Sequence, residues 1–128
     1  MTTHILSDRF AEIIRREHQV FAMKMRVTRA LLGWSQSELA FRIGLTQRAV
    51  HKLEQGDTEP RRATVHAVEH VWLEQHIKFV DLADGGFQVN VGSSLIDRPV
   101  TARSKRHRDA HLQLGVTSLA PYRSAYRA

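Results

Sequence analysis

The sequence predicts a mostly helical domain that is followed by a β-hairpin and a basic arm. Between residues 33 and 76 three kinds of helix signal recur: glycines that end helices, hydroxyl residues that cap them, and apolar residues at helical spacing. After His76 the apolar period changes to two on both sides of an Asp-Gly-Gly turn. The excess positive charge begins after residue 92. These observations predict four segments: a helical extension over residues 1–20, a helical domain over 21–76, a hairpin over 77–92 and a basic arm over 93–128.

Length and composition narrow the class of protein. The 128 residues suffice for one domain of ordinary size, and 42% apolar with 25% charged residues is typical of a globular protein. No stretch approaches the roughly 18 apolar residues of a membrane span, and the first residues lack the basic start and apolar run of a secretory signal. The absence of cysteine excludes disulfides and thiolate metal sites, and it favours a reducing compartment. We therefore expect a cytoplasmic protein without membrane contact.

The charge is distributed unevenly along the chain. Residues 1–92 carry a net charge of +1, whereas the last 36 residues carry +5 of the total of +6. The basic residues of this arm are Arg98, Arg103, Lys105, Arg106, Arg108, Arg123 and Arg127. Because the arm is poor in aliphatic residues and shows no sustained period, we expect it to be extended. Two interpretations stay open: a solvated tail that aids solubility, or an arm that contacts phosphates or another anionic partner.

The first segment is predicted to be helical. Ser7 can cap a helix, and acidic residues follow it in the first turns. Apolar residues recur close to helical spacing at Phe10, Ile13, Ile14, Val20, Phe21 and Met25. No glycine or proline interrupts residues 8–32, so we expect either one long helix or two helices with a bend near His18 and Gln19.

The apolar residues of this leading helix have two explanations, which are packing on their own domain or contact within a dimer. The domain that follows looks complete without them, and this favours a dimer contact for Phe10 and Ile14. The outer strand of the hairpin is the other candidate for the dimer contact. Its apolar residues are Phe87, Val89 and Val91.

Local signals mark three further helices between residues 33 and 76. Gly33 ends the first helix, and Ser35 with Glu38 forms a capping box in which each side chain accepts a hydrogen bond from a backbone N–H. Gly44 ends the next helix, and Thr46 caps the one after it. The apolar residues that we assign to the inner faces are Leu39, Ala40, Ile43, Val50, Leu53, Val65, Val68, Val71 and Trp72, with Trp34 also packed in the core.

Residues 34–56, with the sequence WSQSELAFRIGLTQRAVHKLEQG, resemble the helix-turn-helix of the Xre/Cro/phage-repressor family. Ala40 falls where two helices cross closely, and Gly44 falls where a tight turn favours positive φ. Residues 53–56 form the Leu-Glu-x-Gly ending of that family. The buried positions of the motif are Leu39, Ile43, Leu45, Val50 and Leu53. The resemblance covers residues 23–91 and implies a lambda-repressor-like helical bundle with an added C-terminal hairpin.

The resemblance implies that the second helix of the motif reads double-stranded DNA. This helix starts near Gln47 and would lie in the major groove. Gln47 can pair with adenine, and Arg48 or Lys52 can pair with guanine. Gln36 is similar to the family glutamine that grips a phosphate, at a helix N-terminus that favours an anion. The residues expected at the DNA are Gln36, Ser37, Arg42, Thr46, Gln47, Arg48, His51 and Lys52.

The function implied by this resemblance is that of a nucleoid-associated transcriptional regulator, a homodimeric repressor that reads an inverted repeat. The resemblance also implies a structural ion pair between Arg29 and Glu54. The alternative is a repressor-like interaction module, such as an antitoxin or an antiactivator, whose main partner is another regulatory protein. The near-neutral charge of residues 1–92 and the apolar leading helix favour this alternative modestly.

One further pattern suggests chemistry. His66, Glu69 and His70 match the H-x-x-E-H pattern of inverzincin metallopeptidases, and two histidines four residues apart share a helix face that can bind zinc. A zinc enzyme also needs a distant third ligand and a cleft, so an exposed helix face is the favoured interpretation; His107 and His111 add only a slight signal. The sequence contains no glycine-rich phosphate loop, cysteine nucleophile or Gly-x-Ser-x-Gly elbow. We expect no catalysis, no cofactor and no metal.

Overall fold

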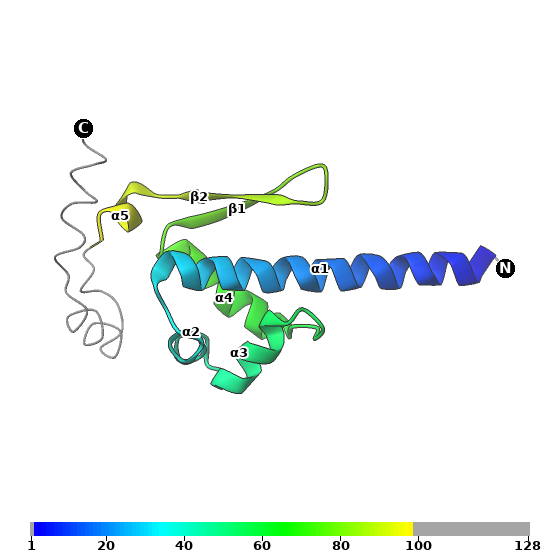
Figure 1. The fold of residues 1–128 in the computed structure, drawn as a ribbon, viewed down its shortest axis with the longest axis horizontal. Coiled ribbons are helices and arrows are strands. Elements are labelled where there is room, and N and C mark those ends of the chain that lie inside the picture. The colour runs from blue at the N-terminus through cyan, green and yellow to red at the C-terminus, as the bar shows by residue number, and fades with distance from the viewer. Residues whose placement is uncertain (1, 99–128) are drawn as a thin grey trace. The chain divides into compact units, whose positions relative to one another are not determined.

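The computed structural model describes residues 2–98, so most of the predicted basic arm, including its histidines, lies outside the described residues. The elements are α1 (Thr2–Leu32), α2 (Gln36–Ile43), α3 (Gln47–Glu54), α4 (Arg62–Glu74), β1 (Ile77–Asp81), β2 (Phe87–Val91) and α5 (Ser93–Ile96). The prediction of a mostly helical domain with a two-stranded hairpin is confirmed (Figure 1). Within residues 2–98 no helix is long and apolar enough to cross a membrane.

Helix α1 is a single helix of 31 residues. Of the two alternatives for the first segment, the uninterrupted helix is the correct one, and no second helix starts near His18 and Gln19. The prediction that Ser7 caps this helix is wrong, because the helix already begins at Thr2. Ile5 and Leu6 extend the helix toward the N-terminus, and no glycine or proline between Thr2 and Ser7 ends it.

The core lies between the second half of α1 and helices α2, α3 and α4. Each of these helices contributes at least one fully buried side chain, and the largest from each are Met25, Leu39, Val50 and Val68. Trp34, Ile77 and Leu95 extend the same cluster toward the loop after α1, the hairpin and α5. Leu45 is only half-buried at the edge of this cluster, so its assignment as a buried position is corrected.

Two capped ends and one glycine set the angle between α2 and α3. The hydroxyl of Ser35 accepts a hydrogen bond from Glu38 N at 3.0 Å, and Thr46 caps α3 in the same way through Ala49 N at 3.1 Å. Gly44 ends α2 in the left-handed conformation, with φ of 74°. The capping box also predicted that the Glu38 carboxylate accepts a hydrogen bond from a backbone N–H. This part of the prediction is corrected, because the carboxylate instead accepts a hydrogen bond from Arg42 Nε at 3.2 Å.

Replacing Gly44 with alanine is expected to lower the free energy of unfolding by about 1–2 kcal/mol, the cost of a left-handed L-residue. A Cβ atom at this position would meet no atom within 4 Å, so backbone strain is the whole effect. Urea denaturation of Gly44→Ala measures the loss. Gly44→Asn is the control, since asparagine tolerates the left-handed region, and equal losses for the two variants would contradict a purely conformational cause.

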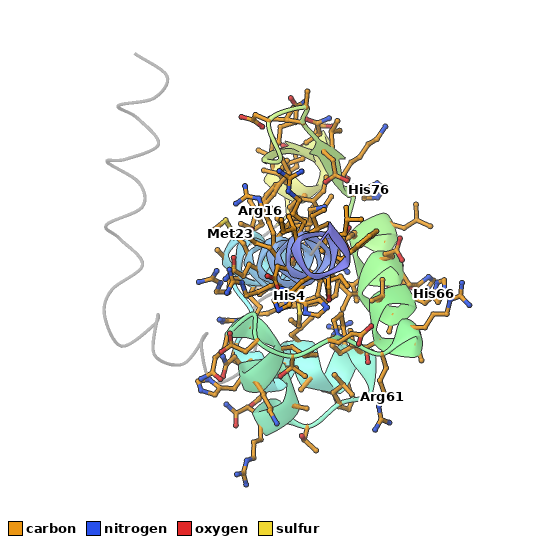
Figure 2. All side chains as sticks on the ribbon, turned by 90° about the vertical axis from the view of Figure 1, so that its right-hand side faces the viewer. His4, Arg16, Met23, Arg61, His66 and His76 are labelled. Atoms are coloured by element: carbon orange, nitrogen blue, oxygen red, sulfur yellow. The ribbon has the colours of Figure 1, made fainter. Side chains whose placement is uncertain are left out.

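The hairpin packs one of its faces against α1 and α4. In its antiparallel register Ile77 lies opposite Val91, Phe79 opposite Val89 and Asp81 opposite Phe87. Trp72 of α4 contacts the ring of Phe79 with centroids 4.7 Å apart, and its indole N–H donates to Thr28 Oγ1 of α1 at 2.7 Å. These contacts hold the hairpin on one side of α1, while α2 and α3 lie on the opposite side (Figures 1 and 2).

The hydrogen-bond register also determines which backbone groups of β2 face outward. Two hydrogen bonds of the ladder lie at the ends of the hairpin. The N–H of Gly92 donates to His76 O, and the N–H of Leu82 donates to Gly86 O. Because hydrogen-bonded and non-hydrogen-bonded pairs alternate in an antiparallel ladder, the backbone groups of Phe87, Val89 and Val91 are directed away from β1.

A one-turn helix, α5, begins inside the segment predicted as an arm. Leu95 is 9% exposed and joins the core cluster, and this contact holds α5 against the domain. A single apolar side chain at this position carries no periodic signal, so the sequence did not predict this helix. The remainder of the arm, from residue 99, lies outside the described residues.

Candidate nucleic-acid interface

Helix α3 presents one polar face to solvent and one apolar face to the core. Val50 is fully buried and Leu53 is 7% exposed. The exposed side chains of this helix are Gln47, Arg48, His51 and Lys52, all of which are among the residues expected at the DNA. They occupy the first two turns of a helix whose N-cap, Thr46, has its hydroxyl engaged by Ala49 N.

Gln36, at the start of α2, connects the two helices of the motif. Its carboxamide oxygen accepts a hydrogen bond from Gln47 Nε2 at 2.8 Å. Its Nε2 donates to Glu54 Oε1 at 3.0 Å and lies 3.3 Å from His51 Nδ1. The side chain of Gln47 is therefore held in position before any ligand arrives, and this reduces the entropy lost on binding.

Arg29 and Glu54 form the ion pair that connects this network to the core. The guanidinium of Arg29 contacts both carboxylate oxygens of Glu54, through Nε at 2.6 Å and Nη2 at 2.8 Å. Glu54 is 5% exposed in its side chain and Arg29 is 25% exposed. Arg29 also donates to Trp34 O at 3.3 Å. One bidentate pair thus ties the end of α3 to α1 and to the loop before α2.

Two other expected DNA residues lie on α2. Ser37 is exposed in the first turn of α2. Arg42 lies in its last turn, where its guanidinium pairs with Glu38 and lies 4.9 Å from the centre of the Trp34 ring. The cation–π contact and the ion pair hold Arg42 against α2 rather than leaving it extended into solvent.

One residue of the polar network was missed by the sequence reasoning. Gln55, at the C-cap of α3, is exposed, and its Nε2 lies 3.3 Å from His51 Nε2. The imidazole of His51 therefore lies between two carboxamides, that of Gln36 on one side and that of Gln55 on the other. The spacing of four residues between His51 and Gln55 was the available signal.

The local charge of this surface is more positive than the net charge of the domain. Helix α3 contains one acidic residue, Glu54, and this carboxylate is buried and paired with Arg29. The solvent-exposed charges of α3 are therefore those of Arg48 and Lys52. The near-neutral composition of residues 1–92 thus does not describe the surface that α3 presents.

The histidines of α4 lie elsewhere. His70 Nε2 pairs with Glu74 Oε1 at 2.7 Å, and His66 points away from the body of the domain (Figure 2). Among residues 2–98 no group of three or more potential metal-ligating side chains is brought together. The arrangement of His66, Glu69 and His70 is that of an exposed helix face.

The fold and the paired short helices define the class of this domain as a helix-turn-helix. Comparison with known families gives the same result, because the family described as helix-turn-helix matches residues 25–71, from the second half of α1 into α4. This match confirms the suspected resemblance of the segment to the Xre/lambda-repressor-like helix-turn-helix family. No curated protein matches the chain.

The match over residues 25–71 supports a DNA-binding helix-turn-helix regulator, with DNA as its partner. The family is a regulatory one and not a family of enzymes. The first half of α1, the hairpin and α5 lie outside the matched residues.

Proposed function

We propose that this protein is a sequence-specific transcriptional repressor that reads an inverted repeat as a homodimer. The observation that carries the proposal is the bond between Gln36 and Gln47, which holds a base-reading side chain at the start of the exposed helix. A carboxamide so placed suits bidentate pairing with adenine, and the neighbouring Arg48 suits guanine. Ser37 and the first turn of α2 suit a phosphate, while His51 and Lys52 extend the contact along α3.

Pairing of two β2 edges is the dimer contact that we propose for operator binding. The outward backbone groups of Phe87, Val89 and Val91 can continue the ladder into a second copy. Val89 and Val91 pack against the core cluster and Phe87 contacts Phe79, so the contact would rest on the backbone and not on apolar side chains. Strand edges are usually blocked by charged residues or proline, and β2, with the sequence FQVNV, contains neither.

The geometry of an edge-to-edge pair supports this choice. Antiparallel pairing of two β2 strands places the two-fold axis perpendicular to the joined sheet. Because the hairpin and α3 lie on opposite sides of α1, rotation about that axis leaves both α3 helices on the same side (Figure 1). Such a pair suits two half-sites about 34 Å apart on one face of a duplex.

Replacing Val89 with proline is expected to abolish this dimer. The Val89 N–H is directed away from β1, so proline removes an outward donor without removing a ladder bond of the hairpin. Val89→Ala is the control, since it loses the same side-chain packing but keeps the N–H. The affinity for an inverted repeat should fall about tenfold or more for Val89→Pro, while a single half-site should bind equally well. Equal binding of both variants to the inverted repeat would contradict the β2 contact.

The experiment that tests the proposed function is selection of binding sites from random duplexes, followed by fluorescence anisotropy across a salt series. We expect an enriched inverted repeat, and a log–log salt slope of about −0.9 for each phosphate contacted. Equal binding to enriched and scrambled duplexes would overturn sequence-specific reading. No detectable binding to any duplex would favour the second candidate below.

The second candidate is a repressor-like module whose main partner is another regulatory protein. The observation that favours it is the exposed apolar face of α1, described below, which lies largely outside the helix-turn-helix match. A protein with either function would act in the cytoplasm, and the repressor would act at the nucleoid. The duplex-binding experiment above separates the two candidates, because the repressor should bind a selected duplex and the protein-binding module should bind none.

A further inference from the structure

The first half of α1 carries an apolar stripe that is not covered by any other element among residues 2–98. Residues 4–17 are all exposed. The exposed apolar side chains of this half are Ile5 at 58%, Leu6 at 55%, Phe10 at 64%, Ile13 at 56% and Ile14 at 47%. Ile5 and Ile14 are nine residues apart and therefore lie on opposite sides of the helix. Leu6, Phe10 and Ile13 share one face and form the stripe, an exposed apolar patch of the kind that marks an interaction surface.

The stripe continues into a groove between α1, α4 and the tip of the hairpin. This groove has a volume of about 520 Å³, and Ile13 belongs to both the stripe and the groove. The apolar side chains that line the groove are Ile13, Val20, Phe21, Val65, Trp72 and Leu82. Leu6, Phe10, Ile13 and Val20 follow the alternating four-and-three spacing of a coiled-coil seam.

We propose that the occupant of this groove is the first half of α1 from a second copy of the chain, and that the insertion is reciprocal. The stripe and the groove belong to the same molecule. A two-fold axis near Ile13 therefore places the stripe of each copy in the groove of the other. The contact is then made twice, which helps it to reach the roughly 800 Å² per partner of a stable interface.

Charge selects the antiparallel orientation of the two helices. Glu17 and Lys24 interrupt the seam at the spacing of its apolar positions, and both line the groove. A parallel pair would place each of these charges against its own copy, which is unfavourable. An antiparallel pair centred on Ile13 instead places Arg9 of one chain opposite Glu17 of the other, so that the interface contains the same ion pair twice.

The stripe lies on the face of α1 opposite to the one that contacts the DNA-reading unit. Ala22 packs near Gly56, where a Cβ atom would lie 3.6 Å away, and Arg29 binds Glu54 of α3. Ile13 precedes Ala22 by nine residues, and Val20 precedes Arg29 by the same interval. Since an α-helix has 3.6 residues per turn, each pair lies two and a half turns apart and therefore on opposite faces.

This arrangement has a consequence that rests on the proposed function. In a pair formed through the stripe, the two α3 helices face away from each other. The contact would therefore join two DNA duplexes, or two separated sites on one duplex, whereas the β2 contact reads adjacent half-sites. The two contacts use different surfaces of the domain.

Single-cysteine variants of the full chain test the contact without DNA, because the natural sequence contains no cysteine. Ile13→Cys is expected to form a disulfide-linked dimer under mild oxidation with oxidised glutathione, since the two-fold axis brings the two copies of this residue together. Ile96→Cys, on exposed α5, is the control and should stay unlinked. Glu17→Cys should stay unlinked, because the antiparallel pair separates its two copies; linkage of Glu17→Cys as well as Ile13→Cys would show a parallel pair and would overturn the proposed orientation. Absence of linkage in both would overturn the contact.

Charge reversal gives a second measurement with an internal rescue. Sedimentation in the Val89→Pro background isolates the stripe contact from the β2 contact. Arg9→Glu and Glu17→Arg should each raise the dimer dissociation constant about tenfold, and combining them should restore it. Phe10→Asp should give a monomer, while Ile96→Asp should not. If Val89→Pro without a change in the stripe sediments as a monomer, the proposal is overturned. Equal effects of Phe10→Asp and Ile96→Asp would also overturn it.

DNA bridging then separates this proposal from the proposed function. Capture of a labelled duplex by an immobilised duplex is expected for the natural chain and not for Phe10→Asp, although both should bind one duplex equally well. Loss of single-duplex binding in both proteins would refute the proposed function and leave the cross-linking result standing. Bridging by both proteins would overturn the role of the stripe.

Discussion

Replacing Arg29 with methionine is expected to lower the free energy of unfolding by about 3–5 kcal/mol, the loss typical of a broken buried ion pair. Methionine keeps much of the volume of the arginine stem but leaves the Glu54 carboxylate, 5% exposed, without its bidentate partner. Gln36 Nε2 would remain as a donor to that carboxylate, but a single amide N–H does not replace a guanidinium. Thermal and urea denaturation of Arg29→Met measure the loss.

Two controls separate the ion pair from loss of charge in general. Arg26→Met removes an exposed arginine one turn earlier on the same helix, and its free energy of unfolding should change by less than about 0.5 kcal/mol. Glu54→Gln should destabilise the protein less than Arg29→Met, because the remaining Arg29 side chain is 25% exposed and can reach water. Equal losses for Arg29→Met and Arg26→Met would show that the pair contributes little.

Replacing both Gln47 and Arg48 with alanine is expected to weaken binding to the selected operator about a hundredfold or more, since each bidentate base contact contributes about 1–3 kcal/mol. Binding to scrambled duplexes should weaken much less, because phosphate contacts carry no sequence information. Gln36→Ala should reproduce part of the loss of discrimination, because it removes the acceptor that holds Gln47 Nε2. Fluorescence anisotropy on both duplexes gives the ratio of affinities.

The matched control for this double variant lies on the hairpin. Gln88→Ala combined with Lys78→Ala removes one carboxamide and one cation from exposed positions on the side of α1 opposite to α3 (Figure 1). Its operator affinity should fall by less than about threefold, as expected for charges distant from the duplex. If the two double variants lose affinity equally, α3 is not the reading helix.

The sequence alone predicted those features that depend on neighbouring residues. A hydroxyl at an N-cap and a glycine at a left-handed C-cap act within one turn of backbone, which explains why the ends of α2 and α3 were placed correctly from Ser35, Gly44 and Thr46. The change of apolar period located the hairpin for the same reason. Ser7 shows the limit of such signals, because a residue suited to a cap still joins a helix that the preceding residues allow.

Only the tertiary structure decided which distant groups meet. The contact of Gln36 with both Gln47 and Glu54 depends on the angle between two packed helices, and no spacing in the sequence encodes that angle directly. The burial of Leu95 and the groove beside Ile13 likewise arise from elements that are far apart in the chain. Local signals are short-range interactions of the backbone, whereas the site and the groove are set by how apolar faces pack together. The sequence therefore determined the helix-turn-helix and the polar residues that its second helix exposes, and the packing around α1 decided that the apolar stripe and this helix lie on opposite sides.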